Sequence, residues 1–124
     1  MKLVFGGAYQ GKLTWARETY GLAEAQCHDC RNGLPETAQS CLYHLEEFTY
    51  ACAKAGLDAP QEMDKHRDLW KDAVLILRDI GSGVVPMDKT ERAWREENGK
   101  LLRYLAREAE RVSRIFCGLE ERLK

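Results

Sequence analysis

The sequence predicts an α/β fold in which helices cover both faces of a small, mainly parallel sheet, a three-layer α/β/α arrangement. Two short apolar runs, residues 2–5 and 73–77, are typical of buried parallel strands. Stretches with the helical spacing of apolar residues lie between these runs and after them. Strands that alternate with helices pair in parallel through right-handed crossovers. The 124 residues suit a single domain, residues 1–124, because two packed cores would need more chain.

The first part of the chain is expected to run strand, glycine loop, helix and weaker strand. Residues 2–5 form the first strand, which stops at two glycines. Residues 12–20 contain few helix breakers and are followed by a glycine, the usual residue after a helix C-terminus. Residues 25–30 predict the weaker strand, closed by turn-forming residues at 31–33.

A long helix is predicted over residues 36–55. Its apolar side chains recur at three- and four-residue steps and would form one buried stripe. The members of this stripe are Ala38, Leu42, Leu45, Phe48 and Cys52. The polar stretch 57–72 can hold a short helix that includes Trp70. Residues 73–77 are the most strongly apolar run, which favours a central place in the sheet.

The last part of the chain is expected to run loop, helix and strand. After a loop over residues 79–87, Asp88 can cap a helix whose third residue is Glu91. This helix should extend to about residue 110 and present one apolar face. Residues 112–117 predict the last strand, and residues 118–124 a short tail.

Composition excludes several classes of function. The 19 Lys and Arg residues nearly balance 20 Asp and Glu residues, so the chain is not basic enough to bind nucleic acid by counterion release alone. No apolar run approaches the roughly 20 residues of a membrane span, and glycines cut short the apolar start before it could serve as a secretory signal. Five unevenly spaced cysteines argue against a disulfide framework. We therefore expect a cytoplasmic protein with no membrane span and no nucleic-acid partner.

The clearest chemical motif follows the first predicted strand. It matches the first seven positions of G-x-x-x-x-G-K and leads into a predicted helix, the context in which this pattern binds phosphate. The residues are Gly6, Gly7, Ala8, Tyr9, Gln10, Gly11 and Lys12. Glycines let backbone N–H groups turn around phosphate oxygens, and the helix adds the positive end of its dipole. The sequence thus predicts a P-loop-type fold, a single nucleotide-binding domain in which residues 6–13 contact phosphates and Lys12 neutralises their charge.

The eighth position of the motif departs from the pattern. A Ser or Thr hydroxyl normally follows the lysine and holds Mg²⁺, whereas Leu13 has no oxygen. Thr14 lies one residue later and points about 100° around the helix, so it is a poor replacement. Phosphate binding should survive this loss better than phosphoryl transfer. The alternative is a glycine-rich turn that binds no ligand.

Asp29 and Asp79 are the acidic candidates. Each closes a predicted strand, and the carboxyl ends of parallel strands share an edge with the phosphate loop. Either carboxylate can hold Mg²⁺ directly or through water, so both are candidate metal ligands and, with Lys12, candidate catalytic residues. The alternative is that each merely caps a strand or a turn.

Three segments together give a family resemblance. They are residues 3–8 with 10–12, residues 79–86 and residues 92–95. This combination resembles the bifunctional adenosylcobinamide kinase and adenosylcobinamide-phosphate guanylyltransferase family of cobalamin biosynthesis. Similar segments in that family read G-G-A-x-S-G-K-S, N-E-V-G-x-G-I-V-P and R-x-x-R-D-x-x-G-x-x-N. In the last of them, Glu96 and Arg103 replace the family's Asp and Asn.

The middle of the chain departs from the family. There an arginine-rich segment, E-M-x-x-R-I-x-x-H-R, supplies the histidine that accepts the guanylyl group. This chain reaches residues 27–30 so soon after its first helix that the segment is absent. His66 stands in a similar local motif, but too late in chain order. By the same resemblance Asp29 matches the D-C of the family's V-D-C-L-T strand and is the carboxylate on the Mg²⁺ side.

The resemblance implies GTP or ATP as ligand, with Mg²⁺ poorly held because of Leu13, a cobinamide-type corrinoid as substrate, and a homo-oligomer. It favours a nucleotide-binding protein of cobalamin biosynthesis that has lost guanylyl transfer. The kinase reaction would transfer a phosphoryl group to adenosylcobinamide, and the site for it lacks a metal ligand at residue 13. One alternative is a catalytically inactive regulatory or scaffolding homologue. The other is a redox or metal protein built on Cys27-x-x-Cys30, although one such pair supplies only half a zinc site.

Overall fold

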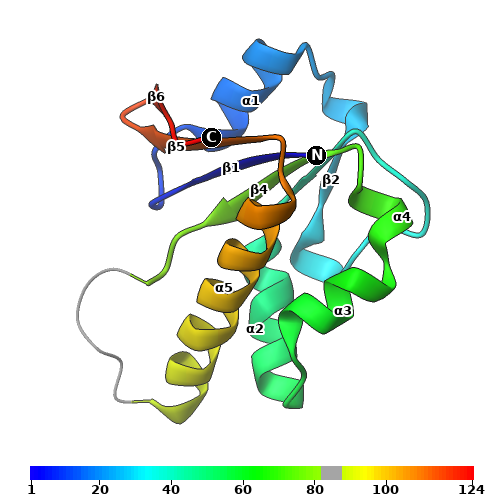
Figure 1. Ribbon diagram of the computed structural model, residues 1–124, viewed down its shortest axis with the longest axis vertical. Helices are drawn as coiled ribbons and strands as arrows, with labels where there is room; N and C mark the ends of the chain where they lie inside the picture. The colour runs from blue at the N-terminus through cyan, green and yellow to red at the C-terminus, as the bar shows by residue number, and fades with distance from the viewer. Residues whose placement is uncertain (82–87) are drawn as a thin grey trace.

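The computed structural model describes residues 1–81 and 88–124 (Figure 1). The strands are β1 (Lys2–Gly6), β2 (Cys27–Asp29), β3 (Cys41–Tyr43), β4 (Val74–Arg78), β5 (Arg111–Phe116) and β6 (Leu119–Arg122). The α-helices are α1 (Lys12–Tyr20), α2 (Leu45–Ala55), α3 (Ala59–Lys65), α4 (Arg67–Trp70) and α5 (Lys89–Glu108). Two short 3₁₀ helices, Glu24–Gln26 and Cys30–Asn32, flank β2.

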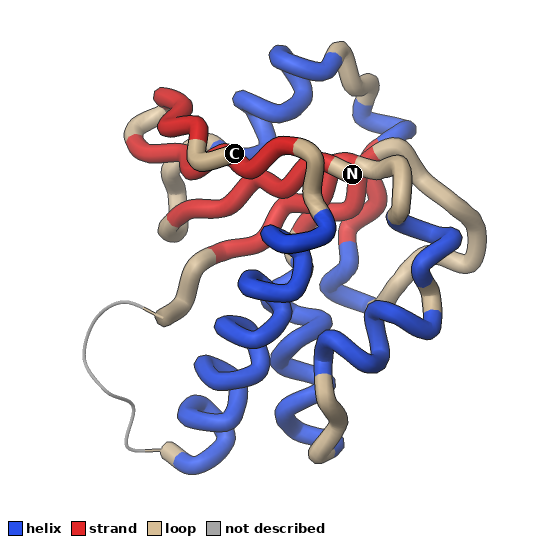
Figure 2. Tube along the Cα trace, viewed as in Figure 1, coloured by secondary structure: helices blue, strands red, loops and turns tan. Residues whose placement is uncertain are grey.

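The strands form one sheet in the order β2-β3-β4-β1-β5-β6. Neighbouring strands are parallel from β2 to β5, and β6 runs antiparallel to β5. Helix α1 covers one face of the sheet, while α2 and α5, with α3 and α4 beside them, cover the other (Figures 1 and 2). The predicted three-layer α/β/α fold is therefore confirmed.

The centre of the sheet explains the two apolar runs of the sequence. Leu3 of β1 pairs with Leu75 of β4, and both pack towards α2 and α5. Val4 and Ile76, the next pair, pack towards α1. Complete burial of one aliphatic side chain contributes about 2 kcal/mol. Because both faces of these strands are covered, apolar residues are favoured at successive positions rather than at alternate ones.

Helix α5 begins and ends close to the predicted residues. The Asp88 side chain accepts a hydrogen bond from the Glu91 N–H at 3.0 Å and so caps the helix. Leu101 and Leu105 lie on the predicted apolar face and are fully buried. None of the helices within residues 1–81 and 88–124 is long and apolar enough to cross a membrane.

The helix predicted over residues 36–55 is wrong in its first half. Residues 41–43 form β3, and α2 begins only at Leu45. Cys41 packs on the α1 face of the sheet and Leu42 on the opposite face, as successive strand residues do. Ala38, placed on the helical stripe, is exposed. The short run at residues 41–43 is compatible with the spacing of a helix and with that of a strand, and its pairing with β2 and β4 makes it a strand.

The tail predicted over residues 118–124 is also wrong, because it contains β6. Phe116 pairs with Leu119, and the two residues between them, Cys117 and Gly118, have φ angles of 52° and 74°. Two positive φ angles are the signature of the tight turn that suits a β-hairpin. All four residues of β6 are exposed, so no alternation of apolar and polar residues marks this strand in the sequence.

Gly6 is expected to be required at the end of β1. A Cβ atom at this position would lie 2.5 Å from the backbone oxygen of Ile115 in β5, and neither backbone can move without disturbing the sheet. We predict that Gly6→Ala lowers the free energy of unfolding by about 2 kcal/mol, measured by urea denaturation. Gly7→Ala is the matched control, since its Cβ would only touch the Gln10 side chain at 3.7 Å. Equal stability of the two variants would contradict the prediction.

Candidate functional site

A cavity of about 420 Å³ adjoins the loop between β1 and α1. Its described walls are the loop from Ala8 onward, the first turn of α1, the ends of β3 and β4, and the first turn of α2. The cavity therefore lies at the carboxyl edge of the parallel strands, where α/β proteins bind their ligands.

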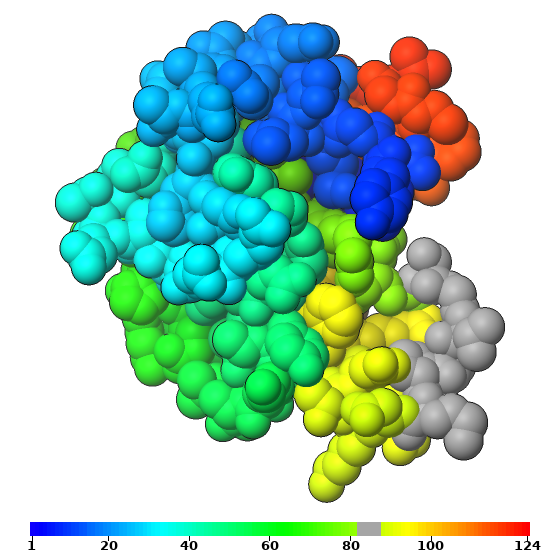
Figure 3. Space-filling view, turned by 180° about the vertical axis from the view of Figure 1, so that it is seen from behind, coloured from blue at the N-terminus to red at the C-terminus, as the bar shows by residue number. Residues whose placement is uncertain are grey.

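The loop is braced by the turn between β5 and β6. The Gly118 N–H donates to the Gln10 backbone oxygen at 2.9 Å, and the Cys117 N–H donates to the Gln10 side-chain oxygen at 2.7 Å. The same juxtaposition is visible at the surface, where the N-terminal segment in dark blue meets the hairpin in orange-red (Figure 3). Tyr9, at the tip of the loop, is fully exposed with φ 59°. The loop is thus held at its base and presents an aromatic ring to solvent.

Lys12 folds back over the glycine loop. Its ammonium group donates to the Gly7 backbone oxygen at 2.7 Å. Burial lowers the pKa of Lys12, the Glu46 carboxylate opposes this shift, and the Arg78 guanidinium adds to it. A partly desolvated cation gains more from an incoming anion than one in open water, because the local dielectric constant is lower.

Glu46 lines the cavity and was missed by the sequence reasoning. It lies in the first turn of α2 and is only 6% exposed. Its Oε1 accepts a hydrogen bond from the Arg78 N–H at 3.0 Å, which ties α2 to the end of β4. The prediction placed residue 46 in the middle of a longer helix. The available signal was an acidic residue in the first turn of a helix, and it could be used only once the true start at Leu45 was known.

Arg78 is the second residue that the sequence reasoning missed, because the predicted strand ended one residue before it. It is the last residue of β4, lies opposite Gly6 in the register and lines the cavity. Its guanidinium group lies over the Trp94 ring at 5.7 Å from the ring centre. The Asn98 side chain donates to the Arg78 backbone oxygen at 2.9 Å, so α5 holds the backbone at this point.

Asp29 is not among the described residues that line the cavity, but its two hydrogen-bond partners, Arg31 and His44, are. Its carboxylate accepts hydrogen bonds from the Arg31 N–H and side chain and lies 2.8 Å from His44 Nδ1. Burial would raise the pKa of Asp29, but these hydrogen bonds outweigh it and hold that pKa below its usual range. His44 and Arg31 both face the cavity, so Asp29 positions two of its walls. Its role as a metal ligand or catalytic residue stays a prediction.

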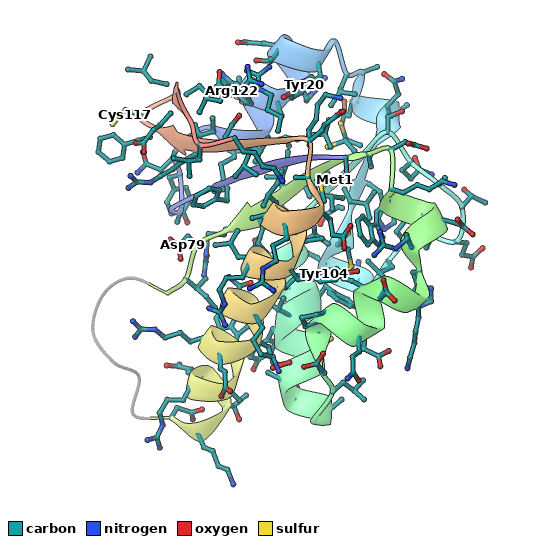
Figure 4. All side chains as sticks on the ribbon, viewed as in Figure 1. Met1, Tyr20, Asp79, Tyr104, Cys117 and Arg122 are labelled. Carbon is teal, nitrogen blue, oxygen red and sulfur yellow. The ribbon has the colours of Figure 1, made fainter. Side chains whose placement is uncertain are left out.

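Asp79 follows β4 directly (Figure 4). Its N–H donates to the Gly6 oxygen at 2.8 Å, and its carboxylate accepts from the Gly81 N–H at 2.9 Å. Arg95 of α5 donates to the Gly81 oxygen. Asp29 ends β2 and Asp79 follows β4, and β3 lies between these two strands, so the two aspartates are not brought together. Residues 82–87, which complete the segment behind the family resemblance, lie outside the described residues.

The residues at the loop do not reproduce the donors that hold Mg²⁺ beside a loop of this type. Leu13 lines the cavity and has no oxygen in its side chain, and Thr14 is the next residue on the same wall. Within the described ranges, no group of three or more His, Cys, Asp or Glu side chains is placed to bind a metal ion. The carboxylates on the described walls of the cavity are Glu46 and Glu47 rather than the predicted aspartates.

Two buried cysteines, Cys30 and Cys41, are poorly suited to redox or metal chemistry. All five are free thiols. Burial, followed by the charges of Asp29 and Glu46, raises the pKa of Cys30 to about 12. Burial, followed by the neighbouring Cys27, raises the pKa of Cys41 as well. The thiolate is the reactive and metal-binding form, and these surroundings disfavour it.

The parallel sheet, with a glycine loop between its first strand and first helix, defines a P-loop-type α/β protein. The family model described as cobinamide kinase / cobinamide phosphate guanyltransferase matches residues 37–123. The chain therefore belongs to this family, as its motifs indicate, and its function is of the cobinamide kinase or guanylyltransferase type. None of the curated proteins matches the chain. The matched residues begin after the glycine loop, so the role of that loop depends on its own sequence and geometry.

We predict that Asp29→Asn destabilises the protein by about 1 kcal/mol at neutral pH, since charge-assisted hydrogen bonds to Arg31 and His44 are weakened. The pKa of Asp29 is lower in the folded than in the unfolded protein. Its contribution to the free energy of unfolding is therefore fully present above about pH 4 and is lost as the pH falls through the folded pKa. Urea denaturation between pH 2 and 7 should show the two proteins converging at low pH. Asp68→Asn, at a 95% exposed carboxylate, is the control. A constant difference between Asp29→Asn and wild type would contradict the assignment.

Proposed function

We propose that residues 1–124 form one P-loop nucleotide-binding domain that holds the triphosphate of GTP or ATP in the cavity beside residues 6–13. The observation that carries this proposal is the position of Lys12. Its partly desolvated ammonium group lies 2.7 Å from the Gly7 oxygen, at the mouth of a braced loop that leads into a helix. Backbone N–H groups and the helix dipole stabilise phosphate oxygens at such a position.

The family points to the second substrate. A cobinamide-type corrinoid carries a hydroxyl that can attack the γ-phosphorus. A new P–O bond forms, the bond to the β,γ-bridging oxygen breaks, the nucleoside diphosphate leaves, and the hydroxyl proton passes to solvent water. Lys12 would stabilise the charge that develops on the leaving diphosphate. The exposed ring of Tyr9 is the proposed contact for an apolar part of the substrate. No step of this proposal requires a residue to hold Mg²⁺. Asp29 and Asp79 remain proposed catalytic residues and metal ligands, and Asp29 also positions His44.

A second candidate, a nucleotide-binding homologue without catalysis, is favoured by Leu13. Both candidates bind nucleotide, and we propose that both lack guanylyl transfer, because the segment with the acceptor histidine is absent. His66 is exposed at the junction of α3 and α4, away from the described walls of the cavity. His44 does line the cavity. Intact-mass measurement after incubation with GTP should therefore show no covalent GMP, and a GMP adduct on His44 would refute the loss.

We predict that Lys12→Met weakens GTP and ATP binding at least tenfold in isothermal titration calorimetry, because a charge-assisted contact is worth about 1.5–3 kcal/mol. Lys71→Met is the control, since this exposed lysine pairs only weakly with Asp68 at 3.6 Å. Absence of binding by the wild-type protein would overturn the proposed function.

A cobinamide phosphorylation assay separates the two candidates. We expect Leu13→Ser to raise turnover and to tighten binding of the Mg²⁺-nucleotide, since it restores the hydroxyl of the pattern. Turnover by either protein supports the kinase, and nucleotide binding without turnover in both supports the inactive homologue. Unchanged Mg²⁺-nucleotide affinity in Leu13→Ser would mean that the departure from the family extends beyond this side chain.

A further inference from the structure

A bound nucleoside triphosphate brings several negative charges into the cavity, and most enzymes of this kind offset them with a metal ion as well as a lysine. Here the position that would hold the metal is Leu13, and neither Asp29 nor Asp79 is among the described residues on the cavity wall. Glu46 and Glu47 add negative charge to the same wall. A second protein cation is therefore needed if phosphates are to bind tightly.

Arg78 meets this need by its place in the fold. It ends the central strand β4, directly opposite Gly6, where the glycine loop starts. It shares the cavity wall with Gly11 and Lys12. The two cations are close enough that Arg78 contributes to the lowered pKa of Lys12.

The guanidinium group of Arg78 is held in place, and its N–H groups remain available to a ligand. Its backbone is fixed on both sides, by Glu46 at its N–H and by Asn98 at its carbonyl oxygen. The guanidinium group lies over the Trp94 ring, a contact that uses its face and leaves its N–H groups free to donate. Among residues 1–81 and 88–124, no carboxylate forms an ion pair with it. By contrast, Arg31, the other arginine on the described wall, is paired with Asp29 at 2.7 Å.

We propose that Arg78 is a second phosphate-binding cation of the cavity, which contacts the terminal phosphates of the bound nucleotide together with Lys12 and makes binding largely independent of Mg²⁺. This inference rests on the proposed nucleotide-binding function and names its charge-neutralising residue. The planar guanidinium suits the task because it can donate two parallel hydrogen bonds to phosphate oxygens.

The test is isothermal titration calorimetry with GTP, ATP and inorganic tripolyphosphate, each in excess Mg²⁺ and in excess EDTA. Wild-type affinity should differ by less than about threefold between the two conditions. Arg78→Gln should weaken binding of all three ligands at least tenfold in EDTA, because a charged hydrogen bond is lost. Arg78→Lys should lose less, since it keeps the charge. Arg107→Gln, at an exposed arginine in the last turn of α5, controls for the loss of one positive charge.

Thermal unfolding of each variant accompanies the titrations, because Arg78→Gln also removes the contact with Trp94. Two results would overturn the inference while leaving the proposed function intact: wild-type binding that requires Mg²⁺, or Arg78→Gln binding in EDTA with wild-type affinity. Failure of the wild-type protein to bind any of the three ligands in either condition would instead overturn the proposed function. A loss of affinity equal in Arg78→Gln and Arg107→Gln would show a general charge effect and refute a specific contact.

Discussion

The parallel pairing of β1 with β4 is the constraint on which the site depends. Its register places Gly6 opposite Arg78, so the glycine loop and the arginine leave the sheet at the same edge. A slip of β1 by one residue would turn the Leu3 side chain from the α2 and α5 face to the α1 face, and the loss of this core packing disfavours any other register. The position of the cavity is thus set by the packing of the core.

A buried polar cluster carries this constraint to the helices. Thr49 Oγ1 of α2 lies 2.8 Å from Asn98 Oδ1, and the Asn98 amide donates to the Arg78 oxygen. The Trp94 N–H donates to the Glu46 backbone oxygen at 2.8 Å. Buried polar groups that are all paired rigidify a structure, because leaving any one unpaired would be costly. Helix α5, which shares motifs with the family, thereby fixes α2 and the end of β4, although it does not belong to the described walls of the cavity.

Binding and chemistry can separate in a site of this design. In the proposed function, the loop, Lys12 and the helix dipole attract the charge of a phosphate without a metal ligand, whereas phosphoryl transfer also needs stabilisation of the charge that develops during reaction. The hydroxyl that Leu13 lacks matters more for phosphoryl transfer than for binding, because it would hold the metal ion. A family member with this loop can therefore bind a nucleotide under the proposed function even where the transfer step is lost.

Elements with a strong local signal could be predicted from the amino-acid sequence. Apolar runs identified β1 and β4, the Asp88 cap identified α5, and the glycine pattern identified the loop with Lys12. It did not determine β3 or β6, because three residues in one case and four exposed residues in the other carry no clear period. Glu46 and Arg78 join the site only through strand pairing and helix packing between residues distant in the chain. Such contacts depend on the three-dimensional arrangement of the elements, which no local pattern in the chain encodes.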